Sequence, residues 1–81
     1  VNPDAKIGKN CKLHGNNCIG NKGNSPETPI IGDDVDIGFG AVIIGGVSLT
    51  NGVTVGANAV VTKSVNKEKS VLVGVPAKRI N

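Results

Sequence analysis

His14 is the only histidine among the 81 residues, and histidine is the side chain that most often accepts a proton near neutral pH. It lies shortly before a polar stretch, residues 21–29, that carries two prolines. Loops that interrupt a rigid scaffold are favoured places for binding and chemistry. Proton transfer by His14 is therefore one chemistry that the sequence allows, and a surface or interface histidine is the ordinary alternative.

The composition argues against several classes of partner. One Phe and no Trp or Tyr leave no stacking platform for single-stranded nucleic acid. No apolar run is long enough to span a bilayer and no signal-peptide pattern is present, so we expect a cytoplasmic protein without a membrane partner. Cys11 and Cys18 lack the spacing of a metal motif, and no second cluster completes a metal site.

Positive charge gathers toward the two ends of the chain. The formal net charge is +3, from nine Lys and Arg residues against six Asp and Glu residues. Most of these side chains are expected to be solvated, but a mild positive field also favours an anionic ligand. The basic residues concerned are Lys6, Lys9, Lys12, Lys63, Lys67, Lys69, Lys78 and Arg79.

From Ile31 onward the sequence repeats every six residues, and this period predicts the fold. Each unit begins with an aliphatic residue and has a second small or branched apolar residue four places later. A hexapeptide period is typical of a parallel β-helix, in which short strands stack as coils around one aliphatic core. The leading residues are Ile31, Ile37, Ile43, Leu49, Val55 and Val61, the second residues are Val35, Ala41, Val47, Val53, Ala59 and Val65, and Val1, Ile7 and Leu13 lead the earlier units.

Three hexapeptides make one triangular coil, so we expect one all-β domain, residues 1–81, with about four coils and almost no helix. Residues 21–29 are interpreted as a loop extruded from a coil corner, because Ser25 occupies an aliphatic position of the frame. Residues 71–75 are predicted to form a last strand, and the tail, residues 76–81, is predicted to leave the solenoid. All strands are expected to be parallel.

The run IGDDVDIGFGAVIIGGVSL, followed by VTVGANAVVTKSV and SVLVGVPAKRI, resembles the C-terminal half of hexapeptide-repeat acyltransferases, and is most similar to the serine O-acetyltransferase branch. The resemblance covers essentially the whole chain. It implies a left-handed β-helix, a homotrimer, and acetyl-CoA bound as co-substrate in the groove between neighbouring subunits. The implied reaction is acetyl transfer to the hydroxyl of a small acceptor, serine in the first instance.

Sugar O-acetyltransferases share the VGANAVVTKSV and VGVPAKRI segments, so the acceptor stays open. Transfer to a sugar or capsular polysaccharide hydroxyl is the alternative activity. A trimeric β-helix scaffold without catalysis is the alternative from a different class of protein.

The resemblance also implies which residues contact the cofactor. Phe39 and Ala57 occupy matching variable positions, one coil apart, that line the pantetheine groove in relatives; relatives have a small residue at the position of Phe39. The Thr62–Lys63 pair matches a cofactor contact near the nucleotide end. Two adjacent basic residues after the V-P-x segment suit the CoA phosphates, Lys78 as a point charge and Arg79 as a fork.

Acetyl transfer to a hydroxyl needs a base, and a carboxylate behind a histidine would orient it. In the serine branch the catalytic histidine is expected on a coil that would precede Val1, and a second active-site histidine corresponds to Thr28 here. His14 aligns with neither, although galactoside-type relatives place a catalytic histidine directly before an extruded loop. From the sequence we therefore expect these 81 residues alone to turn over serine very slowly.

Overall fold

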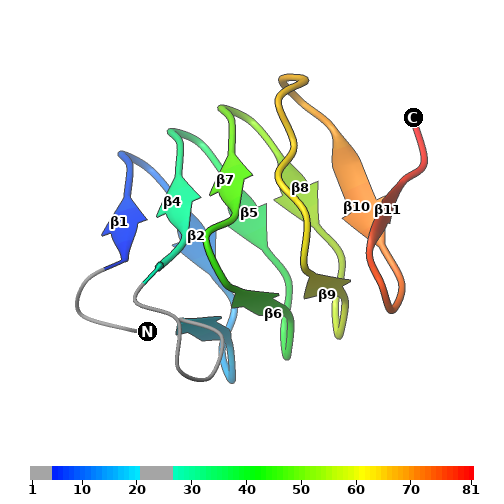
Figure 1. The fold of residues 1–81 in the computed structure, drawn as a ribbon. Coiled ribbons are helices and arrows are strands. Elements are labelled where there is room, and N and C mark those ends of the chain that lie inside the picture. The colour runs from blue at the N-terminus through cyan, green and yellow to red at the C-terminus, as the bar shows by residue number, and fades with distance from the viewer. Residues whose placement is uncertain (1–4, 21–26) are drawn as a thin grey trace.

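The computed structural model describes residues 5–20 and 27–81, and these residues form stacked coils of short strands around a triangular core (Figure 1). Three strands make each turn of the chain. The first coil has β1 (Lys6–Ile7), β2 (Lys12–Leu13) and β3 (Cys18–Gly20); the second has β4 (Ile30–Ile31), β5 (Asp36–Ile37) and β6 (Val42–Ile44); the third has β7 (Ser48–Leu49), β8 (Thr54–Val55) and β9 (Val60–Val61); β10 (Val71–Val73) and β11 (Lys78–Arg79) follow.

Strands of successive coils pair to form three sheets, one on each side of the triangle. Sheet A contains β1, β4 and β7; sheet B contains β2, β5, β8, β10 and β11; sheet C contains β3, β6 and β9. All coil-to-coil pairs are parallel, and Val65 adds a parallel bridge to Leu49 at the start of a fourth turn. The predicted all-β parallel β-helix of about four coils is confirmed.

The core is the aliphatic ladder that the hexapeptide period predicts. Its side chains are at most 3 % exposed, and each stacks on its counterpart one coil away. Burying such a side chain contributes roughly 1.5–3 kcal/mol, which lets a narrow solenoid be stable without a wide globular core. The buried apolar residues are Ile19, Ile31, Val35, Ile37, Ala41, Ile43, Val47, Leu49, Val53, Val55, Ala59, Val61 and Leu72.

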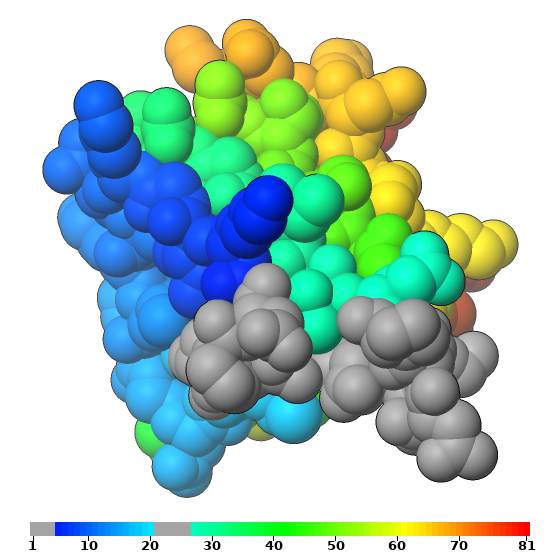
Figure 2. All heavy atoms as spheres, turned by 60° about the vertical axis from the view of Figure 1, so that its left-hand side comes forward, coloured from blue at the N-terminus to red at the C-terminus, as the bar shows by residue number. Residues whose placement is uncertain are grey.

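Leu13 departs from the predicted core for a simple reason. Leu13 is 40 % exposed because none of the described coils covers that end of the solenoid, which faces the viewer in Figure 2. Ile43 and its neighbour Ile44 lie on opposite faces of β6, so Ile43 is fully buried as predicted and Ile44 is only half-buried. The period-2 alternation of a strand places neighbouring side chains on opposite faces.

Hydrogen-bonded side chains hold the corner between sheets A and B. The backbone N–H of Lys9 donates to Asp33 Oδ1 at 2.8 Å, and the backbone N–H of Asp33 donates to Asn51 Oδ1 at 2.7 Å. The next residues at this corner, Asn10 and Asp34, have positive φ values of 58°, a conformation that Asn and Asp tolerate better than most residues. Hydrogen bonds at this corner therefore connect the first coil to the second and the second coil to the third.

The C-terminal tail corrects one prediction. The chain turns out of the coil path after β10, where Gly74 has a φ of 93°, but it then returns as β11, which pairs with β10 in the antiparallel sense. Strands are therefore not parallel throughout. An open strand edge carries unpaired N–H and C=O groups, and β11 satisfies those of β10. The Asn81 side chain closes the hairpin by bonding Val71 N–H and Lys69 C=O, each at 3.0 Å.

The loop predicted at residues 21–29 lies mostly outside the described residues. Its last part, Glu27–Pro29, is described, and Pro29 is buried against the first coil, whose Lys6 N–H donates to its carbonyl at 3.1 Å. No helix among the described residues is long and apolar enough to cross a membrane.

Candidate functional site

His14 has a carboxylate partner that the sequence did not reveal. It follows β2, and its Nε2 lies 2.6 Å from Oδ1 of Asp36 on β5, the adjacent strand of sheet B. The backbone fixes both positions, because His14 N–H donates to the carbonyl of Ile37 at 3.1 Å and β2 pairs with β5 in register. The two side chains are 50 % and 42 % exposed, so a ligand could reach them from solvent.

The contact sets the tautomer of the imidazole. A carboxylate only accepts hydrogen bonds, so the protonated Nε2 of His14 donates a hydrogen bond to Asp36 Oδ1. In the neutral imidazole Nδ1 then has a free lone pair, and Nδ1 has no hydrogen-bond partner among residues 5–20 and 27–81. An imidazole that one carboxylate orients and whose other nitrogen is free to accept a proton has the arrangement of a general base.

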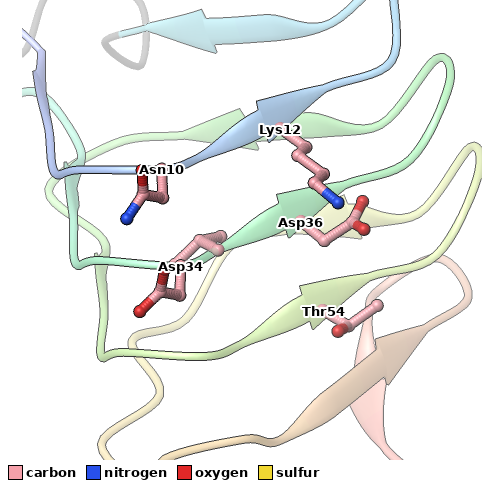
Figure 3. Close-up of a pocket in the computed structure, with 6 residues that line it drawn as sticks. Asn10, Lys12, Asp34, Asp36 and Thr54 are labelled. Carbon is pink, nitrogen blue, oxygen red and sulfur yellow. The ribbon is translucent and has the colours of Figure 1, made fainter.

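A shallow depression of about 350 Å³ lies beside this pair on the outer face of sheet B. Figure 3 shows that Lys12 extends from β2 toward Asp36, and that Thr54 follows on the next strand. Both signs of charge and several hydrogen-bonding groups are thus exposed side by side. The lining residues are Asn10, Lys12, Asp34, Val35, Asp36 and Thr54.

Phe39 and Ala57 stack one above the other at the corner between sheets B and C. Asn58 N–H donates to the Phe39 carbonyl at 2.9 Å, which fixes the two turns one coil apart. The Phe39 ring is 53 % exposed and packs over Gly15 of the first coil, where an added Cβ would lie 3.5 Å from two ring carbons. This corner therefore carries an exposed apolar side chain directly beside the residue that follows His14.

The basic cofactor residues of the sequence analysis lie in two separate places. Thr62 and Lys63 follow β9 at the corner between sheets C and A, and both are exposed. Lys78 and Arg79 form β11 at the end of sheet B, and both are exposed. All four lie toward the C-terminal end of the solenoid, while His14 lies at the other end, so one chain does not gather the predicted residues into one pocket.

Asp36 is the candidate site residue that sequence reasoning missed. The register pairs Lys12 with Asp36, an offset equal to one 18-residue coil plus a six-residue insertion. The insertion lies in the segment from Ile19 to Ile31, which are twelve positions apart in the sequence. Applying that offset to the first coil would have placed Asp36 beside His14 and Lys12.

The fold and its aliphatic ladder are those of a hexapeptide-repeat, left-handed β-helix. Comparisons with known proteins show which proteins with this fold the chain resembles. No family model matches the chain. Over 80 residues the chain is 38 % identical to a serine acetyltransferase of Mycobacterium tuberculosis. The match covers 99 % of this chain and 33 % of that protein. The chain thus spans about a third of the length of this curated relative.

Solved structures agree with this class. A soybean serine acetyltransferase complexed with serine is 28 % identical, with a TM-score of 0.86 over 99 % of this chain and 42 % of its own. A serine acetyltransferase from Brucella abortus in complex with coenzyme A is 27 % identical, with a TM-score of 0.80. The match covers 96 % of this chain and 40 % of that chain. The chain therefore has a β-helix that is similar to the β-helix of serine acetyltransferases.

A sugar-modifying enzyme is also similar over a shorter part. A maltose O-acetyltransferase from Clostridium difficile 630 is 39 % identical, with a TM-score of 0.63 over 67 % of this chain and 28 % of that chain.

Proposed function

We propose that these residues form the acetyl-CoA-binding β-helix of a cytoplasmic O-acetyltransferase that acts on serine. The observation that carries this proposal is the agreement with the serine-bound soybean enzyme along nearly the whole chain, at a TM-score of 0.86. The relative that holds coenzyme A supports acetyl-CoA as the co-substrate. Fold alone would not support an activity, and the sequence identity along the repeat adds to it.

Acetyl transfer to a sugar hydroxyl is the second candidate. It is favoured by the identity of 39 % with the maltose O-acetyltransferase, which exceeds the identity with the solved serine enzymes. That match covers two thirds of this chain, whereas the serine enzymes match it almost entirely. We therefore place serine first.

Lys63 is expected to contact a CoA phosphate, and its removal tests the cofactor proposal. Lys63→Ala should weaken CoA binding about five- to tenfold, because a charge-assisted phosphate contact is lost. Isothermal titration calorimetry with CoA measures this, and affinity should fall as salt is added, since exposed charges are screened. Lys67→Ala is the matched control, because Lys67 is also an exposed lysine, four residues away. Equal affinities for Lys63→Ala and Lys67→Ala would reject the role of Lys63.

The protein is expected to be a homotrimer. Several apolar side chains are more than half exposed, and an interface between subunits would cover such side chains. They are Ile30, Phe39, Val75 and Ile80, with exposures of 52 %, 53 %, 72 % and 65 %. Sedimentation equilibrium at micromolar concentration should give three times the 8.2 kDa mass of the chain. A monomer under these conditions would also remove the groove between subunits.

A further inference from the structure

One bulky side chain lies at a corner where the neighbouring coils have small residues. The corner between sheets B and C stacks one residue from each of the first three coils, namely Gly15, Phe39 and Ala57. Backbone hydrogen bonds fix this stacking, at 3.0 Å between the first and second coils and at 2.9 Å between the second and third. Phe39 is the only Phe in a chain without Trp or Tyr, and it is 53 % exposed. An exposed aromatic ring therefore lies between a residue without a side chain and a methyl group.

The ring of Phe39 packs on the first coil and leaves the third coil uncovered. A Cβ added to Gly15 would lie 3.5 Å from both Cδ2 and Cε2 of the ring, which is ordinary van der Waals contact. Gly15 has a φ of 114°, a conformation that residues with a side chain rarely adopt, so no side chain competes with the ring for this place. Ala57, on the other side of Phe39, is exposed.

The side chain of Asn17 fixes the backbone on which the ring packs. Its Oδ1 accepts a hydrogen bond from Gly15 N–H at 3.2 Å, and its Nδ2 donates to the Gly38 carbonyl at 2.7 Å. The two bonds join the residue under the ring to the residue that precedes Phe39. The first and second coils are thus held together at this corner, and the ring has a fixed place relative to both.

We propose that Phe39 closes the N-terminal end of the cofactor groove and so restricts the acyl group of the bound thioester to a short one such as acetyl. This inference rests on the proposed function and names the residue that selects the acyl donor. Its basis is an exposed ring, fixed on Gly15, directly beside the exposed Ala57. Phe39 is a specificity-determining residue, because it contacts the ligand and takes no part in the bond changes.

The basic residues of the solenoid set the direction in which the ligand lies. Those expected to contact the CoA phosphates follow β9 or form β11, whereas Phe39 lies between β5 and β6, nearer the N-terminal end (Figure 1). A thioester held there by its phosphates points its acyl end toward the first coil. It passes the methyl group of Ala57 and meets the Phe39 ring one coil further on, at a spacing of about 4.8 Å. A longer acyl chain therefore has to displace the ring.

Isothermal titration calorimetry with acetyl-CoA and butyryl-CoA tests this inference without requiring turnover. The wild-type protein should bind butyryl-CoA about tenfold or more weakly than acetyl-CoA, because a single methylene in a closed apolar site is already worth about tenfold. Phe39→Ala should bring the two affinities to within about threefold of each other, since the obstacle is removed. The ratio of the two affinities is compared, so a general loss of cofactor contact at this corner cancels.

Ile30→Ala is the matched control for Phe39→Ala. Ile30 is 52 % exposed, lies on β4 of sheet A, and belongs to the same set of exposed apolar side chains that the trimer would cover. The control therefore accounts for any weakened assembly, and it should keep the wild-type ratio. Phe39→Leu is the second variant, because it keeps an apolar side chain but shortens it, and its ratio should lie between those of the wild type and Phe39→Ala. Circular dichroism checks the fold of each variant.

The outcomes separate this inference from the proposed function. A wild-type protein that binds acetyl-CoA and butyryl-CoA alike, or a ratio that neither Phe39 variant changes, overturns the inference and leaves cofactor binding in place. Loss of both thioesters in both Phe39 variants but not in Ile30→Ala also overturns it, because the ring would then hold the cofactor rather than limit the acyl group. A wild-type protein that binds neither thioester overturns the proposed function and the inference together.

Discussion

Gly38→Ala is expected to lower the free energy of unfolding by about 3 kcal/mol, the upper end of the usual cost of overpacking. A Cβ at this position would lie 2.6 Å from Ala57 N and 2.9 Å from both Gly56 C and Val55 O. All three atoms belong to the backbone of the next coil, so no side chain can rotate to make room. The coil spacing is fixed in turn by the bond from Gly38 N–H to the Val55 carbonyl, at 2.8 Å.

Gly56→Ala is the matched control for Gly38→Ala, one coil later at the same corner. There the nearest atom to an added Cβ is Val73 Cγ1 at 3.1 Å, followed by the Leu72 carbonyl oxygen at 3.3 Å. Because Val73 is partly exposed and can shift, the expected loss is about 1 kcal/mol. Urea denaturation followed by circular dichroism measures both variants. Equal losses in the two would contradict the close approach of the second and third coils at Gly38.

Ile43→Ala is expected to cost about 2–5 kcal/mol, because it opens a cavity in the middle of the ladder. Ile43 is 0 % exposed and lies in register between Ile19 of the first coil and Val61 of the third. Its neighbour Ile44 points to the other face and is half-buried, so Ile44→Ala should cost about 1 kcal/mol or less. Thermal and urea unfolding of the pair test the inward register. Similar losses for the two variants would contradict the register in which Ile43 lies inside.

The hexapeptide period predicted the core well, because the same side of every strand must face the same narrow bore. Of the twelve positions predicted to point inward between Ile31 and Val65, only Val65 is not buried. Val65 begins the incomplete fourth turn, where it has a bridge to Leu49 and no coil on its other side among the described residues. The period therefore specifies which residues face inward, and the end of the repeat specifies where that stops.

The period did not predict contacts on the outside of the solenoid. His14 and Asp36 are in contact because the insertion between the first and second coils shifts the strand pairing by one further hexapeptide. The hexapeptide pattern of aliphatic residues describes inward side chains only, so it does not indicate which outward side chains are neighbours. The antiparallel return of β11 was hidden for a similar reason. Its residues, Lys78 and Arg79, are both exposed and carry no period, so only backbone pairing to β10 defines the strand.

The residues predicted to contact the cofactor illustrate a further limit of the sequence. Phe39 and Ala57 share a corner, but Lys63 lies at another corner and Lys78 lies on β11. A groove formed by two subunits could use residues from separate corners, and the trimer that we propose would supply it. Sequence alignment gives the residues of such a groove without showing which subunit provides each one.

The measurement that tests the central claim most directly is acetyl transfer itself. The protein is incubated with acetyl-CoA labelled with ¹³C in the acetyl group and with L-serine, and the products are followed by NMR and mass spectrometry. Labelled O-acetylserine that accumulates slowly, together with an equal amount of free CoA, is the result that we predict. Acetyl-CoA that neither binds nor loses its acetyl group, with serine and maltose both unchanged, would contradict the account.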